Sequence, residues 1–144
     1  MALRALICED DPSIRALVRT VLTREGFEVD VAPDGGVGLE RLRVGCYDVL
    51  LLDLMMPGVD GYEVIRTVKE ERPPTLKRVV VMTAASEAIQ NSLPEPVCKL
   101  LPKPFDIDQL VAAVKDCVEA CTGSVTEAPE ENTVAEEETS GGGP

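Results

Sequence analysis

Short apolar runs alternate with amphipathic segments along the first 121 residues of the chain. Each run ends at polar or turn-forming residues, which is typical of strands buried on both faces of a parallel sheet. The segments between the runs repeat apolar residues at helical spacing. The pattern predicts strands near residues 3–8, 27–31, 49–52, 78–82 and 97–101, and helices at 12–25, 34–43, 62–71, 87–92 and from 107 onwards.

A strand followed by a helix, repeated five times, predicts an α/β fold. Its sheet is parallel, covered by helices on both faces and joined by right-handed crossovers. We expect the strands to be added in a single direction, so that their carboxyl ends lie together at one edge. Such edges are where open α/β sheets bind ligands.

Composition divides the 144 residues into one domain and a tail. The chain is 44% hydrophobic but has two Phe, two Tyr and no Trp, so aliphatic side chains must fill the core. From Thr122 onward there is no periodicity, and the segment holds six glutamates and no basic residue. We therefore expect a domain over residues 1–121 and a disordered acidic tail over 122–144.

Charge and cysteine content limit the possible functions. A net charge of -12 argues against nucleic acid as a partner, since phosphate contacts need clustered Lys and Arg. No apolar stretch is long enough for a signal peptide or for membrane insertion. Five cysteines without a Cys-x-x-Cys pair, and no histidine, make a zinc site improbable and favour free thiols in the cytoplasm. Cys8 and Cys98 are expected in the core, and Cys117 on a solvated or interfacial helix face.

Polar side chains follow four of the five expected strands. Glu9 and Asp10 follow the first, Asp53 the third, Thr83 the fourth and Lys103 the fifth. Each alone could be a helix cap or a strand-end residue. Together, at one edge of the sheet, they form a site with three carboxylates, a hydroxyl and an ammonium group.

Such crowded carboxylates favour a bound cation. A set of oxygen ligands suits Mg²⁺, which keeps waters and prefers a phosphate alongside. Mg²⁺, a lysine and a threonine around one carboxylate are what an aspartyl-phosphate needs. The metal and the ammonium would stabilise the phosphoryl oxygens while Asp53 attacks in line.

Four motifs in this order resemble the receiver domain of two-component response regulators. They are E-D-D-P-S at 9–13, L-L-L-D-L-M-M-P-G-V-D-G at 50–61, M-T-A at 82–84 and L-P-K-P-F at 101–105. The resemblance covers residues 3–121. It implies a CheY-like, flavodoxin-like (βα)5 three-layer sandwich that is phosphorylated on Asp53 by a sensor histidine kinase or a phosphotransfer protein.

The resemblance also assigns roles at the metal. Asp10, Asp53 and the backbone carbonyl of Met55 would bind Mg²⁺, and Glu9 would act through a water or indirectly. The chain has no histidine of its own, so the phosphoryl donor is expected on another chain. No segment with helix-turn-helix or catalytic motifs follows, so output through an unidentified protein partner is expected.

Around the phosphoryl group, the resemblance makes Thr83 the switch hydroxyl. Lys103 would pair with the phosphoryl group, positioned by a cis bond to Pro104. Two features depart from the family pattern. Leu100 stands where Tyr or Phe is usual, and the fourth helix is short and followed by prolines. Both departures fall on the face that the family generally uses for output.

Three other functions remain as alternatives. A phosphorylation-independent docking module (a pseudo-receiver) would fit Leu100 and the short fourth helix, and it should ignore beryllofluoride and Mg²⁺. A small phosphatase would need a second acid/base carboxylate close behind Asp53, where Met55 stands. A flavin-binding protein would need a phosphate-cradling loop after the first strand, where three acids stand instead. We therefore do not expect a metabolic enzyme.

Overall fold

The computed structural model of the protein describes residues 2–84 and 97–126, with side chains up to residue 120. The helix expected at 87–92 and residues 127–144 of the expected tail lie outside this part of the chain. The elements in order are β1 (Arg4–Cys8), α1 (Pro12–Arg24), β2 (Glu28–Ala32), α2 (Gly35–Val44), β3 (Val49–Asp53), α3 (Gly61–Glu71), η1 (Pro73–Arg78), β4 (Val79–Thr83), β5 (Lys99–Pro102) and α5 (Ile107–Thr126).

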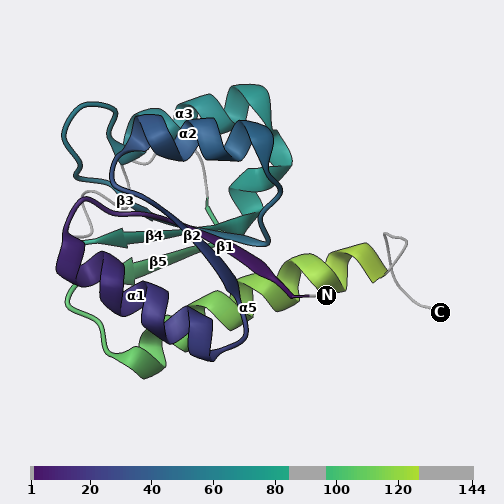
Figure 1. Ribbon diagram of the computed structural model, residues 1–144. Helices are drawn as coiled ribbons and strands as arrows, with labels where there is room; N and C mark the ends of the chain where they lie inside the picture. The colour runs from purple at the N-terminus through teal and green to yellow at the C-terminus, as the bar shows by residue number, and fades with distance from the viewer. Residues whose placement is uncertain (1, 85–96, 127–144) are drawn as a thin grey trace.

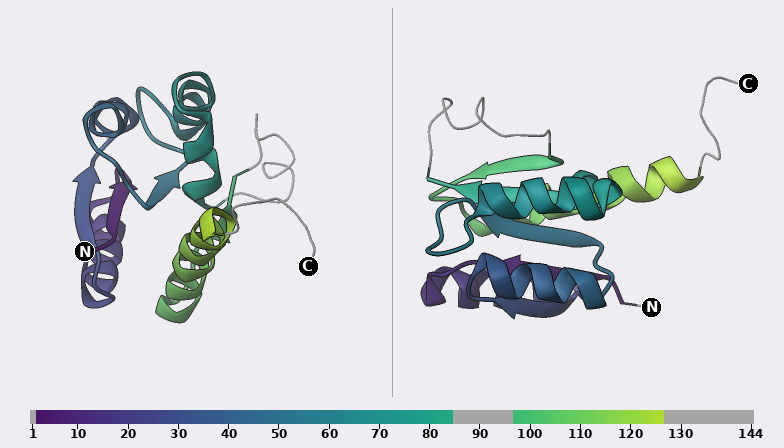
Figure 2. Two further views of the ribbon diagram at one scale, coloured as in Figure 1. Left: turned by 90° about the vertical axis from the view of Figure 1, so that its right-hand side faces the viewer. Right: turned by 90° about the horizontal axis from the view of Figure 1, so that it is seen from above.

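The strands form one parallel sheet in the order β2-β1-β3-β4-β5. Helices α2 and α3 cover one face, and α1 and α5 cover the other (Figures 1 and 2). The α/β fold with helices on both faces is therefore confirmed. The single direction of winding was wrong, because the chain goes from β1 outward to β2 and then returns past β1 to β3. This reversal separates the loops that follow β1 and β3, and it creates the crevice where ligands bind in such sheets.

In the described part of the chain, an aspartate side chain caps the start of each of the helices α1, α2, α3 and α5. Asp34 Oδ1 accepts from the Val37 amide at 2.9 Å. Asp106 Oδ1 accepts from the Gln109 amide at 2.7 Å, and Gln109 Oε1 accepts from the Asp106 amide at 2.9 Å. This reciprocal pair fixes the start of α5. The other two caps are Asp11 for α1 and Asp60 for α3.

Two aliphatic cores lie on either side of the sheet. Alternate residues of β3 serve both of them, with Leu50 and Leu52 facing α2 and α3 and Leu51 facing α1 and α5. All of β3 is buried, as expected for a central parallel strand. Cys8 is a free thiol in the first core. Cys117 is also buried, and its Sγ donates to the Lys77 carbonyl at 3.4 Å, so its placement on a solvated face was wrong.

Most boundaries agree with the sequence prediction within one residue, and three differences are larger. The short helix η1, which the sequence pattern did not predict, begins with Pro73 and Pro74, since proline is tolerated in the first turn of a helix. Strand β5 begins at Lys99 rather than at Val97. Helix α5 continues to Thr126, beyond the expected domain boundary at residue 121. None of the helices in the described residues is long and apolar enough to cross a membrane.

A polar network closes the amino edge of the sheet, opposite the candidate site. Asp30 Oδ2 accepts from the Tyr47 hydroxyl at 2.6 Å and from Arg4 Nη2 at 3.0 Å. The Arg4 guanidinium lies 4.9 Å from the centre of the Tyr47 ring. Burial, followed by the hydrogen bond to Asp30, raises the pKa of Tyr47 to about 12. The phenol therefore stays neutral and ties β1, β2 and the start of β3 together.

Gly38 packs directly against Cys8, and this contact gives a test of the fold. A Cβ at Gly38 would lie 2.5 Å from Cys8 Sγ, so Gly38→Ala should lower the free energy of unfolding by about 1–3 kcal/mol. In a Cys8→Ala background the sulfur is gone and Ala32 Cβ is 3.9 Å away. There the same change should be neutral, or should stabilise by up to about 1 kcal/mol through helix propensity.

Urea unfolding of the wild type, both single variants and the double variant measures this coupling. An equal cost of Gly38→Ala in both backgrounds would show that α2 does not approach β1 as described.

Candidate functional site

The carboxyl ends of β1, β3, β4 and β5 bring the expected polar residues to one edge of the sheet. Glu9 follows β1 and is fully buried, while Asp53 ends β3 and Thr83 ends β4 with 4% and 2% exposure. Lys103 follows β5, and its amide donates to the Thr83 carbonyl at 2.7 Å. Four segments distant in sequence thus place these side chains together, and the expected grouping is present.

The Lys103 ammonium lies between two buried carboxylates. Its Nζ is 2.8 Å from Glu9 Oε1 and 3.5 Å from Asp53 Oδ2. The second oxygen of Glu9 accepts from the Asp11 amide at 3.2 Å. Glu9, expected to act only indirectly at a metal, is therefore the nearer partner of Lys103, which spacing alone did not reveal.

Burial and the neighbouring charges shift the pKa values of both Glu9 and Lys103. The pKa of Glu9 is raised to about 7. Loss of hydration is the largest cause, the hydrogen bond from Lys103 opposes it, and Asp53 adds to it. For Lys103, burial disfavours the charged form, but the hydrogen bond to Glu9 and the charge of Asp53 outweigh it and raise its pKa. Lys103 is therefore a fixed cation at neutral pH.

Asp10 completes a cluster of three carboxylates. One oxygen from each of Glu9, Asp10 and Asp53 lies within 4.8 Å of the others. Within the described part of the chain, the Asp10 carboxylate makes no hydrogen bond or ion pair. Lys103 supplies one positive charge against three negative ones. An all-oxygen set with a charge deficit and one exposed member fits a hard divalent cation such as Mg²⁺.

The loop after Asp53 is held close to that residue. The Met55 amide donates to Asp53 Oδ1 at 3.1 Å, while the Met55 side chain is 64% exposed. A backbone group, rather than the thioether, therefore serves the site. The segment that carries the Met55 carbonyl, the expected third Mg²⁺ ligand, is thus fixed beside Asp53.

Two glycines allow this loop to approach its neighbours. A Cβ at Gly61, the first residue of α3, would lie 2.5 Å from the Asp53 carbonyl oxygen and 2.6 Å from Leu54 Cα. A Cβ at Gly35, the first residue of α2, would overlap the Val59 carbonyl oxygen. These contacts are with backbone atoms, which cannot rotate away. Sequence reasoning treated Gly61 only as a loop marker and missed its close contact with the Asp53 backbone.

The remaining expected features are partly described. The Lys103–Pro104 bond is cis, as the resemblance implied. Leu100 is partly buried and packs against the core beneath α2 and α3. The fourth helix, the other departure from the family pattern, lies outside the described residues.

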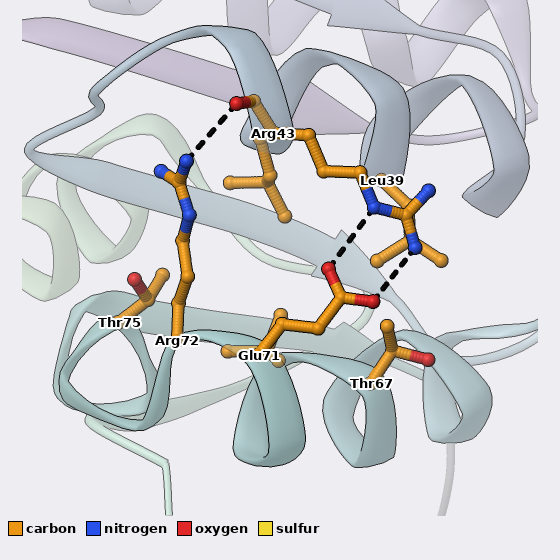
Figure 3. A pocket seen from close by; sticks show the side chains of 8 residues that line it. Leu39, Arg43, Thr67, Glu71, Arg72 and Thr75 are labelled. Carbon is orange, nitrogen blue, oxygen red and sulfur yellow. Dashed lines mark hydrogen bonds and ion pairs between the residues drawn. The ribbon is translucent and has the colours of Figure 1, made fainter.

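A small pocket lies elsewhere, between the ends of α2 and α3 (Figure 3). At its mouth Arg43 forms two hydrogen bonds with Glu71, of 3.0 and 2.9 Å, and Arg72 donates to the Arg43 carbonyl at 3.0 Å. Leu39 and Leu42 line its interior. No residue of the carboxylate cluster contributes to it. The pocket lies between two helices and is separate from the candidate site.

Comparison with known proteins identifies the class. The family model of the response regulator receiver domain matches residues 5–115. Response regulator ArlR of Staphylococcus epidermidis is 33% identical over 112 residues, which are 76% of this chain and 50% of that protein. Transcriptional regulatory protein TcrA of Mycobacterium tuberculosis is 36% identical over 115 residues, which are 78% of this chain and 44% of that protein.

Solved structures agree. Response regulator TrrA of Thermotoga maritima, in complex with Mg²⁺-BeF, has a TM-score of 0.72 and 30% identity over 80% of this chain and 98% of its own. A CheY-like receiver domain from Methanospirillum hungatei JF-1 has a TM-score of 0.78 at 24% identity, covering 86% of this chain and 99% of its own, and shows the fold alone.

The chain therefore belongs to the response regulator receiver domain family. Its class is a signalling receiver of two-component systems with the flavodoxin-like fold, not a metabolic enzyme. The chain spans about half the length of the first curated relatives it matches.

Repulsion within the carboxylate cluster can be tested with Asp10→Asn. Without Mg²⁺ this variant should unfold at a higher temperature than the wild type, because one of three crowded carboxylates becomes neutral. The change breaks no hydrogen bond or ion pair of the Asp10 side chain with the described residues. The wild type should gain thermal stability on addition of Mg²⁺, because a ligand that binds only the folded state stabilises it. Asp10→Asn should lose most of that gain.

Glu119→Gln removes one negative charge at an exposed position on α5, outside the cluster. It should change neither the unfolding temperature without Mg²⁺ nor the thermal stability gained on addition of Mg²⁺. An unchanged Mg²⁺ response in Asp10→Asn would exclude Asp10 from the metal site.

Proposed function

We propose that Asp53 accepts a phosphoryl group from a sensor histidine kinase or phosphotransfer protein in a Mg²⁺-dependent reaction. The chain then signals through altered affinity for a protein partner. The observation that carries this proposal is the buried Asp53 carboxylate, set between the Lys103 ammonium at 3.5 Å and the acidic pair Glu9 and Asp10.

The transfer requires Asp53 to be ionised and held in place. A carboxylate oxygen attacks phosphorus, a P–O bond forms, and the P–N bond to the donor imidazole breaks with its electron pair leaving on nitrogen. The amide of Met55 holds one oxygen of Asp53, and Lys103 lies near the other. Burial at 4% exposure leaves the carboxylate little freedom to rotate away from an incoming phosphoryl group.

Mg²⁺ fits the same cluster. Asp10, Asp53 and the backbone carbonyl of Met55 would hold it, with Glu9 acting indirectly through its pairing with Lys103. The ion would neutralise charge on the phosphoryl oxygens during transfer. A Mg²⁺-BeF complex is named for the relative from Thermotoga maritima, which supports this assignment.

Thr83 and Lys103 would bind the phosphoryl group once it is on Asp53. Thr83 lies at the end of β4 with 2% exposure, next to the point where the Lys103 backbone joins β4. We assign its hydroxyl to a hydrogen bond with the phosphoryl group. Lys103 would shift from Glu9 toward the new phosphoryl oxygens, because a doubly charged group attracts it more strongly than a single carboxylate does.

The downstream output remains open to more than one partner class. That nucleic acid is not a partner stays a prediction, because the match covers only 50% and 44% of relatives named transcriptional regulators. A docking-only module is the other reading from the sequence. Leu100 fits that module, but the cluster assembled around Lys103 supports the phosphorylated receiver.

The proposal predicts that acetyl phosphate with Mg²⁺ adds one phosphoryl group, detected as a mass increase of the intact protein. Asp53→Asn should abolish the gain, because an amide is a poor nucleophile. Lys103→Met should slow phosphorylation, because it removes the cation nearest to Asp53. Chelation of Mg²⁺ should prevent the gain in every variant.

Asp30→Asn changes an acid in the middle of β2, which binds Arg4 and Tyr47 and is not part of the cluster, and it serves as the control for Asp53→Asn. A folded wild-type protein that gains no mass, or a gain that survives in Asp53→Asn, would overturn the proposal.

A further inference from the structure

Arg15 reaches from α1 to the backbone of the acidic pair. Its Nη1 donates to the Glu9 carbonyl at 2.9 Å, with a longer contact of 3.5 Å to the Asp10 carbonyl. The Arg15 amide donates to the Asp11 carbonyl at 2.9 Å, so backbone and side chain together bind three consecutive residues. No motif in the sequence marked this residue.

Arg15 binds the turn that carries Glu9 and Asp10, two of the three clustered carboxylates. Before the turn, the Glu9 amide donates to the Ala32 carbonyl at 3.1 Å. After it, the Asp11 carboxylate caps α1 by accepting from the Ser13 amide at 2.8 Å. Between these anchors the Asp11 amide donates to Glu9 Oε2 at 3.2 Å, which leaves the Glu9 and Asp10 carbonyls to be bound by another group. Arg15 binds both.

We infer that Arg15 is a positioning residue for Mg²⁺ binding, which rests on the proposed function above. By fixing the carbonyls of Glu9 and Asp10, it sets the direction in which the Asp10 carboxylate leaves the backbone. The Asp10 side chain has no recorded partner of its own among the described residues, so its backbone is what places it. Groups that orient metal ligands typically change metal affinity by about 10–100-fold when removed.

Charge and positioning predict opposite effects, which makes the inference testable. The guanidinium is a permanent positive charge on the turn that holds the acidic pair, and like charges repel. If charge alone mattered, its removal would strengthen Mg²⁺ binding. If positioning dominates, removal weakens binding.

The test is a Mg²⁺ titration followed by backbone amide shifts, at a temperature where every variant is folded. Arg15→Met keeps the apolar stem and removes the donors, and we expect its dissociation constant for Mg²⁺ to rise about tenfold. Arg15→Lys keeps the charge and a single donor group. Its dissociation constant for Mg²⁺ should lie between those of the wild type and Arg15→Met. Phosphorylation of Arg15→Met by acetyl phosphate should recover at saturating Mg²⁺, because Asp53, Thr83 and Lys103 are unchanged.

Arg19→Met is the matched control. Arg19 lies one turn further along α1, is exposed, and makes no hydrogen bond or ion pair with the described residues. It should bind Mg²⁺ as the wild type does. A purely structural role of Arg15 would lower thermal stability without changing the Mg²⁺ dissociation constant.

The possible failures are distinguishable. If the wild type itself binds no Mg²⁺, the proposed function fails, and the role of Arg15 fails with it. If the wild type binds Mg²⁺ and Arg15→Met binds it equally well or more tightly, positioning by Arg15 is wrong while the proposed function stands.

Discussion

The pairing of Lys103 with Glu9 and Asp53 is the interaction on which the carboxyl edge of the sheet depends. Two carboxylates buried this deeply need a partner, and the ammonium at 2.8 and 3.5 Å is the cation that the described residues provide. With this one cation, the three-carboxylate cluster keeps a net negative charge. Asp10 is the member of the cluster that is exposed to solvent. A bound divalent cation would offset this negative charge. A phosphoryl group on Asp53, as proposed, would add to it and would therefore depend on the cation and on Lys103.

Backbone contacts also hold this arrangement in place. Gly61 lies against the Asp53 carbonyl, Lys103 donates to the Thr83 carbonyl, and Arg15 donates to the Glu9 carbonyl. Each contact joins the segment after one strand to a neighbouring element. Under the proposed function, a shift of one of these segments on phosphorylation of Asp53 would also move the element that it contacts.

Much of the fold and the site could be predicted from sequence, because the signals were local or repeated. Buried strands showed as apolar runs, and Asp34 and Asp106 occupied cap positions whose chemistry is short-range. The choice of Glu9 as the nearer partner of Lys103 depends on side-chain geometry across 94 residues, which no spacing reveals. The end of α5 was missed because a helix extends past its periodic face without leaving a pattern. Gly61 required knowledge of what lies beside it.

Beryllofluoride, a mimic of the phosphoryl group, gives the most direct test of the central claim that Asp53 and its neighbours form a phosphorylation site. Fluorine NMR of the protein with beryllofluoride should show bound signals only when Mg²⁺ is present, and Asp53→Asn should abolish them. Absence of bound signals in folded wild-type protein with Mg²⁺ would contradict the account. Signals that persist in Asp53→Asn would do the same, because they would place the ligand at another site.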